Sequence, residues 1–415
     1  MIVQLVGKMH GVNSFHKFIL ALLVLVTYLG LGATQEASDA YLTIMETFAK
    51  YNYEGEEHET VTEDGYILKM QRLLPKINRT DANLPPVMLV HGLMGSSENF
   101  IIVGPKRSLP YLLADRGYEV WLPNCRGNFH SRKHVTLDPD NNKTYWHFSW
   151  HEIGKYDLPA MIDYILETTN KSQIIYGGHS QGTTVFYVMA SERPEYQSKV
   201  KLSMSLAPSV FLEHTKQPML RAVSKYYRYW HNLVSALNQY EFIPFIPNNV
   251  ARGLTSYMCQ LPGPMQYVCR MLVLMLIGSD PEQLEPATIP IVYAQIPAGA
   301  SAWQFLHYAQ SIVSGEFKQY DFGKRINMKR YNSKTPPYYN LNITTPIGLF
   351  YAKNDMLNDV EDVENLSRIL PNVVKLYKVP YEFFTHFDFV MAKDVVPFVY
   401  KEVLKLIEGY ENKTD

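Results

Sequence analysis

Ser180 lies in the pattern G-x-S-x-G, between Gly178 and Gly182. The apolar run 174–177 comes directly before this pattern, and a helix-like segment, 183–190, follows it. A strand that turns sharply into a helix exposes the serine between them, and small residues on either side let the two backbones approach closely. A serine held in this way can attack a carbonyl carbon, so we interpret Ser180 as a candidate nucleophile.

A serine hydroxyl needs a base to accept its proton and an acid to orient that base. Where the nucleophile sits on such an elbow, the order along the chain is serine, then acid, then histidine. Of the 13 histidines, His386 alone follows His307, and it comes after the apolar run 373–377. Asp355 lies in a turn directly after the apolar run 347–351. We therefore predict Asp355 as the acid and His386 as the base.

Other aspartates near these positions fit the acid role less well. Asp359 and Asp362 fall in the helix-like segment after Asp355, where we expect them to cap a helix or face solvent. Asp388 comes shortly after His386, and we expect it to be structural.

Attack on an ester carbonyl creates an oxyanion, which needs preorganised N–H donors. One donor is the backbone N–H that follows the nucleophile, here Gln181, and the other comes from the loop after an early strand. The apolar run 86–90 ends in a glycine-containing turn, 91–95. We therefore predict that the N–H groups of Leu93 and Gln181 line an oxyanion hole.

The N-terminal residues have the pattern of a secretory signal. His16 and Lys17 precede an apolar run, 18–31, and small residues follow it. Because this run is shorter than the roughly 20 residues that span a bilayer, we expect 1–33 to be a cleaved signal peptide. The mature chain would then have no transmembrane anchor and would be extracellular or lysosomal. An uncleaved signal anchor is the alternative.

Other features agree with the secretory pathway. Triplets of the form N-x-S/T offer candidate glycosylation sites at Asn78, Asn142, Asn170, Asn342, Asn365 and Asn412. Cys259 and Cys269 lie close together in sequence and are candidates for a local disulfide in an oxidising compartment. Cys125, the third cysteine, ends an apolar run, so a buried thiol is expected.

Composition excludes several function classes. Lys and Arg total 39 and Asp and Glu total 40, so nothing indicates a nucleic acid or another polyanionic partner. Hydrophobic residues make up 47% of the 415 residues, as in a globular protein with a large core. No C-x-x-C or H-E-x-x-H spacing is present, so we predict no metal site.

Short apolar runs alternate with helix-length segments through most of the chain. Residues 57–74 read as a hairpin, and the runs are 86–90, 118–122, 173–177, 200–207, 347–351 and 373–377. This rhythm is typical of an α/β fold with a mainly parallel sheet covered on both faces.

The rhythm fails between residues 209 and 335, which are rich in aromatic residues and methionine. We predict a largely helical cap over the carboxyl ends of the strands, where α/β sheets bind ligands. A second, independent domain is the alternative. The predicted core is therefore divided into 34–208 and 336–415, with 209–335 inserted between them.

Ordered motifs extend over nearly the whole chain after the predicted signal. They lie at residues 61–68, 91–97, 124–128, 148–157, 178–183, 336–339, 354–355 and 386–389. In this order they resemble the acid lipase family, the group that contains gastric and lysosomal acid lipases. Cys125 departs from the family's N-x-R-G-N pattern, which more often has serine there, and we assign it no chemistry.

The resemblance implies an α/β-hydrolase fold, a lid within 209–335 and no cofactor. It implies the same triad, Ser180, Asp355 and His386, that the residue order predicts. The expected activity is hydrolysis of neutral-lipid acyl esters, of the triacylglycerol type, at a lipid–water interface. A sterol-ester hydrolase or carboxylesterase is the alternative. A non-catalytic lipid-binding protein on the same fold is more remote, because such a protein would be expected to lose part of the triad.

Overall fold

The computed structural model describes residues 40–77, 84–242, 249–260, 263–278, 280 and 282–411; for 249–252, 254–255 and 275–277 it describes the backbone alone. The expected signal peptide and the triplets at Asn78 and Asn412 lie outside the described residues. Within the described ranges, no helix combines the length and the apolar character needed to cross a membrane.

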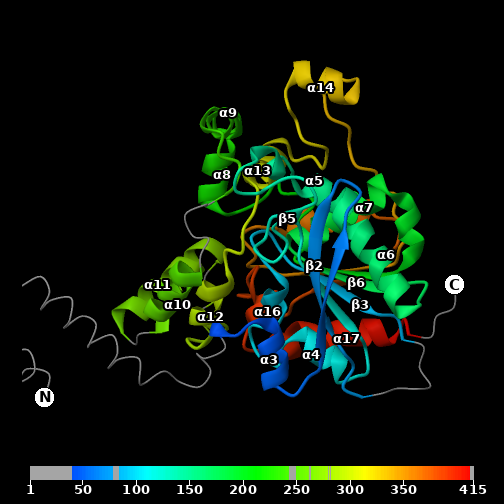
Figure 1. The fold of residues 1–415 in the computed structure, drawn as a ribbon, viewed down its shortest axis with the longest axis vertical. Helices are drawn as coiled ribbons and strands as arrows, with labels where there is room; N and C mark the ends of the chain where they lie inside the picture. Colours follow the sequence, from blue (N-terminus) through cyan, green and yellow to red (C-terminus); the bar gives the residue numbers. More distant parts are fainter. Residues whose placement is uncertain are drawn as a thin grey trace, which may run out of the picture.

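A single mixed sheet forms the centre of the molecule, in the order β1-β2-β4-β3-β6-β7-β8-β9, with β5 paired to β2 (Figure 1). The pairs β1–β2, β2–β4 and β2–β5 are antiparallel, and every pair from β4 through β9 is parallel. The strands are β1 Gly55–Val61, β2 Tyr66–Leu73, β3 Val87–Val90, β4 Val120–Pro123, β5 Lys133–His134, β6 Ile174–His179, β7 Val200–Leu206, β8 Ile347–Tyr351 and β9 Val373–Lys378. The expected α/β fold with a mainly parallel sheet is confirmed.

Both faces of the central strands are buried, which explains their continuous apolar runs. Side chains alternate between the faces: Val87 and Leu89 of β3 join one core cluster, and Met88 and Val90 join the other. Helices α3, α4, α16 and α17 contribute to the first cluster, and α6 and α7 contribute to the second (Figure 1).

The helices of the core precede, connect or follow the strands of the sheet. They are α3 Ile44–Lys50, α4 Leu109–Ala114, α5 Trp150–Glu152, α6 Leu158–Thr169, α7 Gln181–Glu192, α15 Val360–Ile369, α16 Asp388–Met391 and α17 Lys401–Glu408. A π-helical turn, Ile153–Asp157, joins α5 to α6. Helix α7 is buried from Gln181 to Ala190, so it is the central helix behind the sheet.

Between β7 and β8 the described chain contains helices and no strand. These helices are α8 Pro218–Ser224, α9 Tyr227–Leu237, α10 Asn249–Gln260, α11 Pro264–Ile277, α12 Thr288–Gln295, α13 Ala302–Ser314 and α14 Lys324–Tyr331. Helices α8 and α9 pack on α13, and α10, α11 and α12 pack on one another. Figure 1 shows α8, α9, α13 and α14 at one end of the molecule and α10 to α12 as a separate group beside the sheet.

A buried cation fastens the hairpin β1–β2 to the helical side of the core. The Arg126 guanidinium donates to Asp157 Oδ1 at 2.6 Å and to Asp64 Oδ2 at 2.6 Å, and it lies 3.9 Å from the centre of the Tyr66 ring. Arg126 and Asp157 are fully buried, so this pair is kept out of water. The loop 124–128 that carries Arg126 is thereby held in one position beside β3.

Candidate active site

Ser180 occupies a strained turn between β6 and α7. Its backbone has φ 55° and ψ −120°, a region that non-glycine residues seldom adopt. A Cβ atom at Gly178 would lie 2.5 Å from the Gly182 backbone, and one at Gly182 would lie 2.2 Å from the Val90 carbonyl oxygen. Both positions therefore require glycine, and the local sequence explains why this turn places a serine at the carboxyl end of the sheet.

Asp355 and His386 form a buried pair at the same edge of the sheet. Asp355 follows β8, His386 follows β9, and each side chain is 1% exposed. His386 Nδ1 lies 2.8 Å from Asp355 Oδ2. The other carboxylate oxygen accepts the N–H groups of Leu357, 2.8 Å away, and Asn358, 2.9 Å away. A carboxylate held in this way orients the imidazole with Nδ1–H directed at the acid, which leaves Nε2 to accept a proton.

The histidine loop is fastened to the serine turn. His179 Nε2 donates to the backbone carbonyl of His386, 2.9 Å away, and the two rings lie 5.1 Å apart. Since His179 is the residue before Ser180, the structure brings the serine turn, the acid and the histidine together at one place.

The loop after β3 lies directly against Ser180. A Cβ atom at Gly92 would lie 3.1 Å from the Ser180 Cβ. His91 shapes this loop: its Nδ1–H donates to the Gly92 carbonyl at 2.8 Å, and its Nε2 accepts the Cys125 N–H at 3.1 Å. Burial lowers the pKa of His91 to about 4, which agrees with the neutral ring that these two bonds require. Leu93 is half-buried beside Gly92, and Gln181 begins α7, so the two predicted oxyanion donors flank the serine turn.

Two site residues were missed by sequence reasoning. Asn358 is buried, and its amide nitrogen lies 3.1 Å from His386 Nδ1, 3.5 Å from Asp355 Oδ2 and 3.0 Å from the Ala207 carbonyl oxygen. His179 occupies a variable position of the G-x-S-x-G pattern, to which the pattern assigns no role. Neither has a sequence signal of its own, because each acts on a residue that is distant in the chain.

The other aspartates have separate roles. Asp359 caps α15 by accepting the Glu361 N–H, as expected. The expectation that Asp362 caps a helix or faces solvent is wrong: it is buried and accepts the backbone N–H of His214 at 3.0 Å, with His214 Nδ1 at 2.8 Å. Asp388 accepts the Thr385 N–H and hydroxyl, and burial raises its pKa to about 7.

Segments between β7 and β8 reach the same site. The Ala298 N–H donates to the Met94 carbonyl at 2.7 Å, and Gln304 of α13 donates to the Gln181 side chain at 3.1 Å. A Cβ atom at Gly278, after α11, would lie 3.3 Å from the Asn354 carbonyl oxygen. These contacts join the helical segment to the serine turn, to the loop after β3 and to the acid loop.

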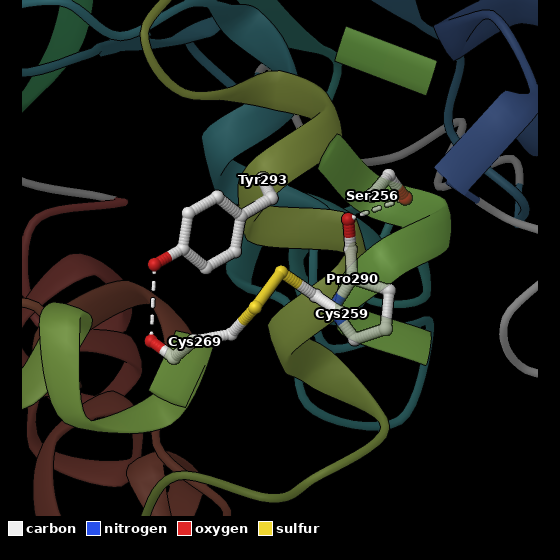
Figure 2. Close-up of a disulfide and its surroundings, with 5 residues drawn as sticks. All are labelled: Ser256, Cys259, Cys269, Pro290 and Tyr293. Atoms are coloured by element: carbon white, nitrogen blue, oxygen red, sulfur yellow. Dashed lines mark hydrogen bonds between the residues drawn. A yellow bond between two sulfur atoms is a disulfide. The ribbon is translucent and has the colours of Figure 1, made fainter. Parts of the chain in front are cut away.

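A disulfide between Cys259 and Cys269 links α10 to α11 (Figure 2). Tyr293 of α12 donates its hydroxyl to the Cys269 carbonyl at 3.0 Å, and the Ser256 hydroxyl donates to the Pro290 carbonyl at 2.9 Å. The disulfide and these hydrogen bonds therefore join all three helices.

The structure also shows the third cysteine and most of the candidate glycosylation sites. Cys125 is a free, buried cysteine. Among the triplet asparagines within the described ranges, Asn170 and Asn342 are exposed and Asn142 and Asn365 are half-buried. No group of three or more His, Cys, Asp or Glu side chains in that part of the chain could hold a metal ion.

Known proteins with the same fold and similar sequences are lipases and other hydrolases. Residues 85–389 match the family described as alpha/beta hydrolase fold, and residues 44–104 match a partial alpha/beta-hydrolase lipase region. Lipase 3 of Drosophila melanogaster is 40% identical over 394 residues, which is 94% of this chain and 99% of that protein. Lipase 1 of the same species is 40% identical, over 89% of this chain and 80% of its own.

Human gastric triacylglycerol lipase is 33% identical over 384 residues, which cover 88% of this chain and 91% of the human enzyme. These relatives share nearly the full length of the chain, so the similarity includes the sheet, the serine turn and the helical segment. The chain therefore belongs to the α/β-hydrolase family, and within it to the acid lipases, which are carboxylic ester hydrolases.

Proposed function

We propose that this protein is a serine lipase that hydrolyses acyl esters of neutral lipids, of the triacylglycerol type, to free fatty acids. The observation that carries the proposal is the buried pair of His386 and Asp355, whose loop is hydrogen-bonded to the strained turn that holds Ser180. This constellation can activate a serine for attack on an ester.

In the proposed reaction the Ser180 hydroxyl oxygen attacks the ester carbonyl carbon while His386 Nε2 takes the hydroxyl proton. Asp355 stabilises the imidazolium that forms. The oxyanion accepts hydrogen bonds from the backbone N–H groups of Leu93 and Gln181, each worth about 2.7–4 kcal/mol in the transition state. His386 then protonates the departing alcohol, which leaves an acyl-enzyme. Water activated by the same histidine releases the fatty acid and restores Ser180.

We propose that residues 209–335 form a cap and lid over this site. The contacts of Ala298 with Met94 and of Gln304 with Gln181 support the proposal, because Met94 directly follows Leu93 and Gln181 is the second predicted oxyanion donor. An apolar lid that opens at a lipid surface would make activity rise when the substrate exceeds its solubility. A saturation curve that stays smooth through that concentration would contradict lid opening at the interface.

The proposed location is the secretory pathway, with an extracellular or lysosomal destination. The disulfide between Cys259 and Cys269 supports it, because such bonds persist in oxidising compartments. Exposed triplets at Asn170 and Asn342 are accessible to glycosylation, and mass spectrometry of the secreted protein would show whether they carry glycans.

The first experiment compares the wild type with Ser180→Ala and with Ser198→Ala, an exposed serine in the turn Pro194–Lys199 that follows α7. Fatty-acid release would be measured from emulsified trioleoylglycerol and cholesteryl oleate across acidic to neutral pH. We expect turnover of trioleoylglycerol by the wild type and Ser198→Ala and none by Ser180→Ala. Release from cholesteryl oleate alone would favour the sterol-ester alternative. No release from either substrate by folded wild type would refute the lipase assignment.

A further inference from the structure

The end of the molecule that carries α8, α9 and α14 is rich in positively charged side chains. Residues 214–240 and 322–354 contain no Asp or Glu, although the whole chain has a net charge of −1. We define the basic face by its exposed cations on and beside these helices: Arg221, Lys225, Arg228, Lys324, Arg325, Lys329, Arg330 and Lys334. The positive charge is therefore concentrated by position and does not reflect the overall composition.

The cations of the basic face are not held in salt bridges by the described acids. Among the described residues, no carboxylate forms an ion pair with any of them. Lys216, at the start of the same segment, differs because it pairs with Asp359 at 2.5 Å. Asp321 is a nearby acid, and its carboxylate accepts hydrogen bonds from the Gly323 N–H and the Asn327 amide. The pKa of Arg228 is raised by its hydrogen bond to Tyr227 and, to a smaller extent, by the charge of Asp321. The basic face thus carries a positive charge that anions from outside can meet.

Large apolar side chains lie among these cations. Tyr226 is 65% exposed, Tyr229 60% and Trp230 38%, and α9 has no buried residue at all. Met328 of α14 is also exposed. A helix with aromatic and basic side chains and no buried position is the type that lies in the surface of a lipid layer. Tyrosine and tryptophan are favoured there because their rings are amphipathic.

Contacts between aromatic side chains join α9 and α14 into one surface. His231 of α9 lies 2.9 Å from the Tyr320 hydroxyl, Tyr320 stacks on Trp303 of α13 at 5.4 Å, and the Arg330 guanidinium lies 4.4 Å from the Phe322 ring. Figure 1 shows both helices projecting at the same end of the molecule. The cations and the exposed aromatic residues can therefore face one flat partner together.

This surface is also connected to the active site. The backbone N–H groups of Lys216 and Gln217, at the start of α8, donate to the Met356 carbonyl at 2.9 and 3.0 Å. Met356 directly follows Asp355. Binding at α8 and α9 would therefore occur on the element that is hydrogen-bonded to the acid loop.

We propose that α8, α9 and α14 form the surface by which this enzyme docks on lipid layers that contain acidic phospholipids. The inference rests on the proposed lipase function, and it adds the charge of the interface that the enzyme selects. The cations attract the anionic headgroups, and the attraction weakens as salt screens it. Tyr226, Tyr229 and Trp230 enter the headgroup layer.

The test uses the full chain with Ser180→Ala, so that hydrolysis cannot alter the lipid. Co-sedimentation would be measured with vesicles of phosphatidylcholine alone and of phosphatidylcholine mixed with phosphatidylglycerol. We expect about tenfold tighter binding or more to the mixed vesicles, lost at high salt. Adding Lys324→Gln, Arg325→Gln and Lys329→Gln should remove this preference. The matched control carries Lys378→Gln, Lys401→Gln and Lys405→Gln, which neutralise exposed lysines on β9 and α17, and should retain it.

A second variant, Tyr226→Ser with Tyr229→Ser, should weaken binding to both kinds of vesicle, because it removes the side chains that enter the layer. Equal binding of the α14 variant and its control would overturn the proposal. Tight binding to heparin with no binding to mixed vesicles would also overturn it, in favour of an acidic polysaccharide partner.

Hydrolysis of the soluble ester p-nitrophenyl butyrate by the same variants on the active background separates the two proposals. We expect the α14 triple variant and its matched control to hydrolyse this ester at the wild-type rate, because neither alters the active site. If the wild type does not hydrolyse any ester but the α14 variant loses vesicle binding, the lipase function fails and the docking surface stands.

Discussion

His179 and His386 are joined by a hydrogen bond from a side chain to a backbone carbonyl, 2.9 Å long, across 207 residues of sequence. Burial lowers the pKa of His179 to about 3, so its ring stays neutral in moderately acidic conditions. The bond connects the turn that carries Ser180 to the loop that carries His386, the predicted base. We therefore expect His179 to act as a positioning residue.

Replacing His179 tests this role. His179→Phe keeps an aromatic ring but removes the hydrogen-bond donor. We expect kcat on a soluble ester to fall about 10- to 100-fold, which corresponds to the loss of roughly 1.4–3 kcal/mol from a buried hydrogen bond. KM should change little, because His179 does not bind substrate. His179→Gln offers an N–H donor and should recover part of the loss. An equal fall in both variants, together with lost stability, would indicate a structural role alone.

The acid assignment distinguishes Asp355 from its neighbours. Asp355→Asn should leave the fold intact and lower kcat about 10⁴-fold, because the amide no longer favours the required tautomer of His386. Asp359→Asn is the matched control, since asparagine also caps helices and the side chain lies outside the His386 contact. The measurement is steady-state hydrolysis of a soluble ester. Comparable losses in both variants would contradict the assignment.

His91 should make the protein less stable in acid. Its pKa is about 4 in the folded chain and 6.5 in its ordinary state, so the unfolded chain binds a proton first as the pH falls. This residue therefore lowers the free energy of unfolding between pH 6.5 and pH 4, by about 3 kcal/mol. Denaturant unfolding at both pH values should show that His91→Gln, which cannot titrate, reduces the loss by about this amount.

His214 provides a control of opposite sign. The hydrogen bond to Asp362 raises its pKa, so the folded chain binds the proton more tightly and gains stability as the pH falls. His214→Gln should then leave the acid loss as large as in the wild type or make it larger. A smaller loss in His214→Gln would mean that the acid sensitivity arises elsewhere.

The buried Arg126 should be among the most important side chains for stability. Arg126→Met leaves Asp157 fully buried without its cation, which typically costs about 3–5 kcal/mol. Thermal or urea unfolding at neutral pH would measure the change. Arg193→Met is the matched control, because Arg193 pairs with the exposed Glu63 and Glu195, and it should cost about 1 kcal/mol or less. Similar costs in both variants would contradict the importance of burial.

Much of the architecture could be predicted because it depends on local patterns. The apolar runs at 86–90, 347–351 and 373–377 became β3, β8 and β9, since a strand buried on both faces needs a continuous apolar sequence. The elbow at Ser180 was readable because its glycines are required by backbone contacts within a few residues of one another and with β3.

The chain order of serine, acid and histidine predicted Asp355 and His386 without any knowledge of their positions in space. Order does not reveal what supports them. Asn358 could not be recognised, because its place in the site depends on its contacts with His386 and Ala207. The expectation for Asp362 was wrong because its partner, His214, lies 148 residues earlier in the chain.

The sequence by itself determined the sheet, the serine turn and the candidate triad, because strand periodicity, glycine geometry and chain order are all local or ordered along the chain. The tertiary structure alone decided that His179 holds the His386 loop, that Gln304 reaches Gln181 and that α9 and α14 share one face. These relationships depend on which distant segments pack together, and packing is set by the whole core at once.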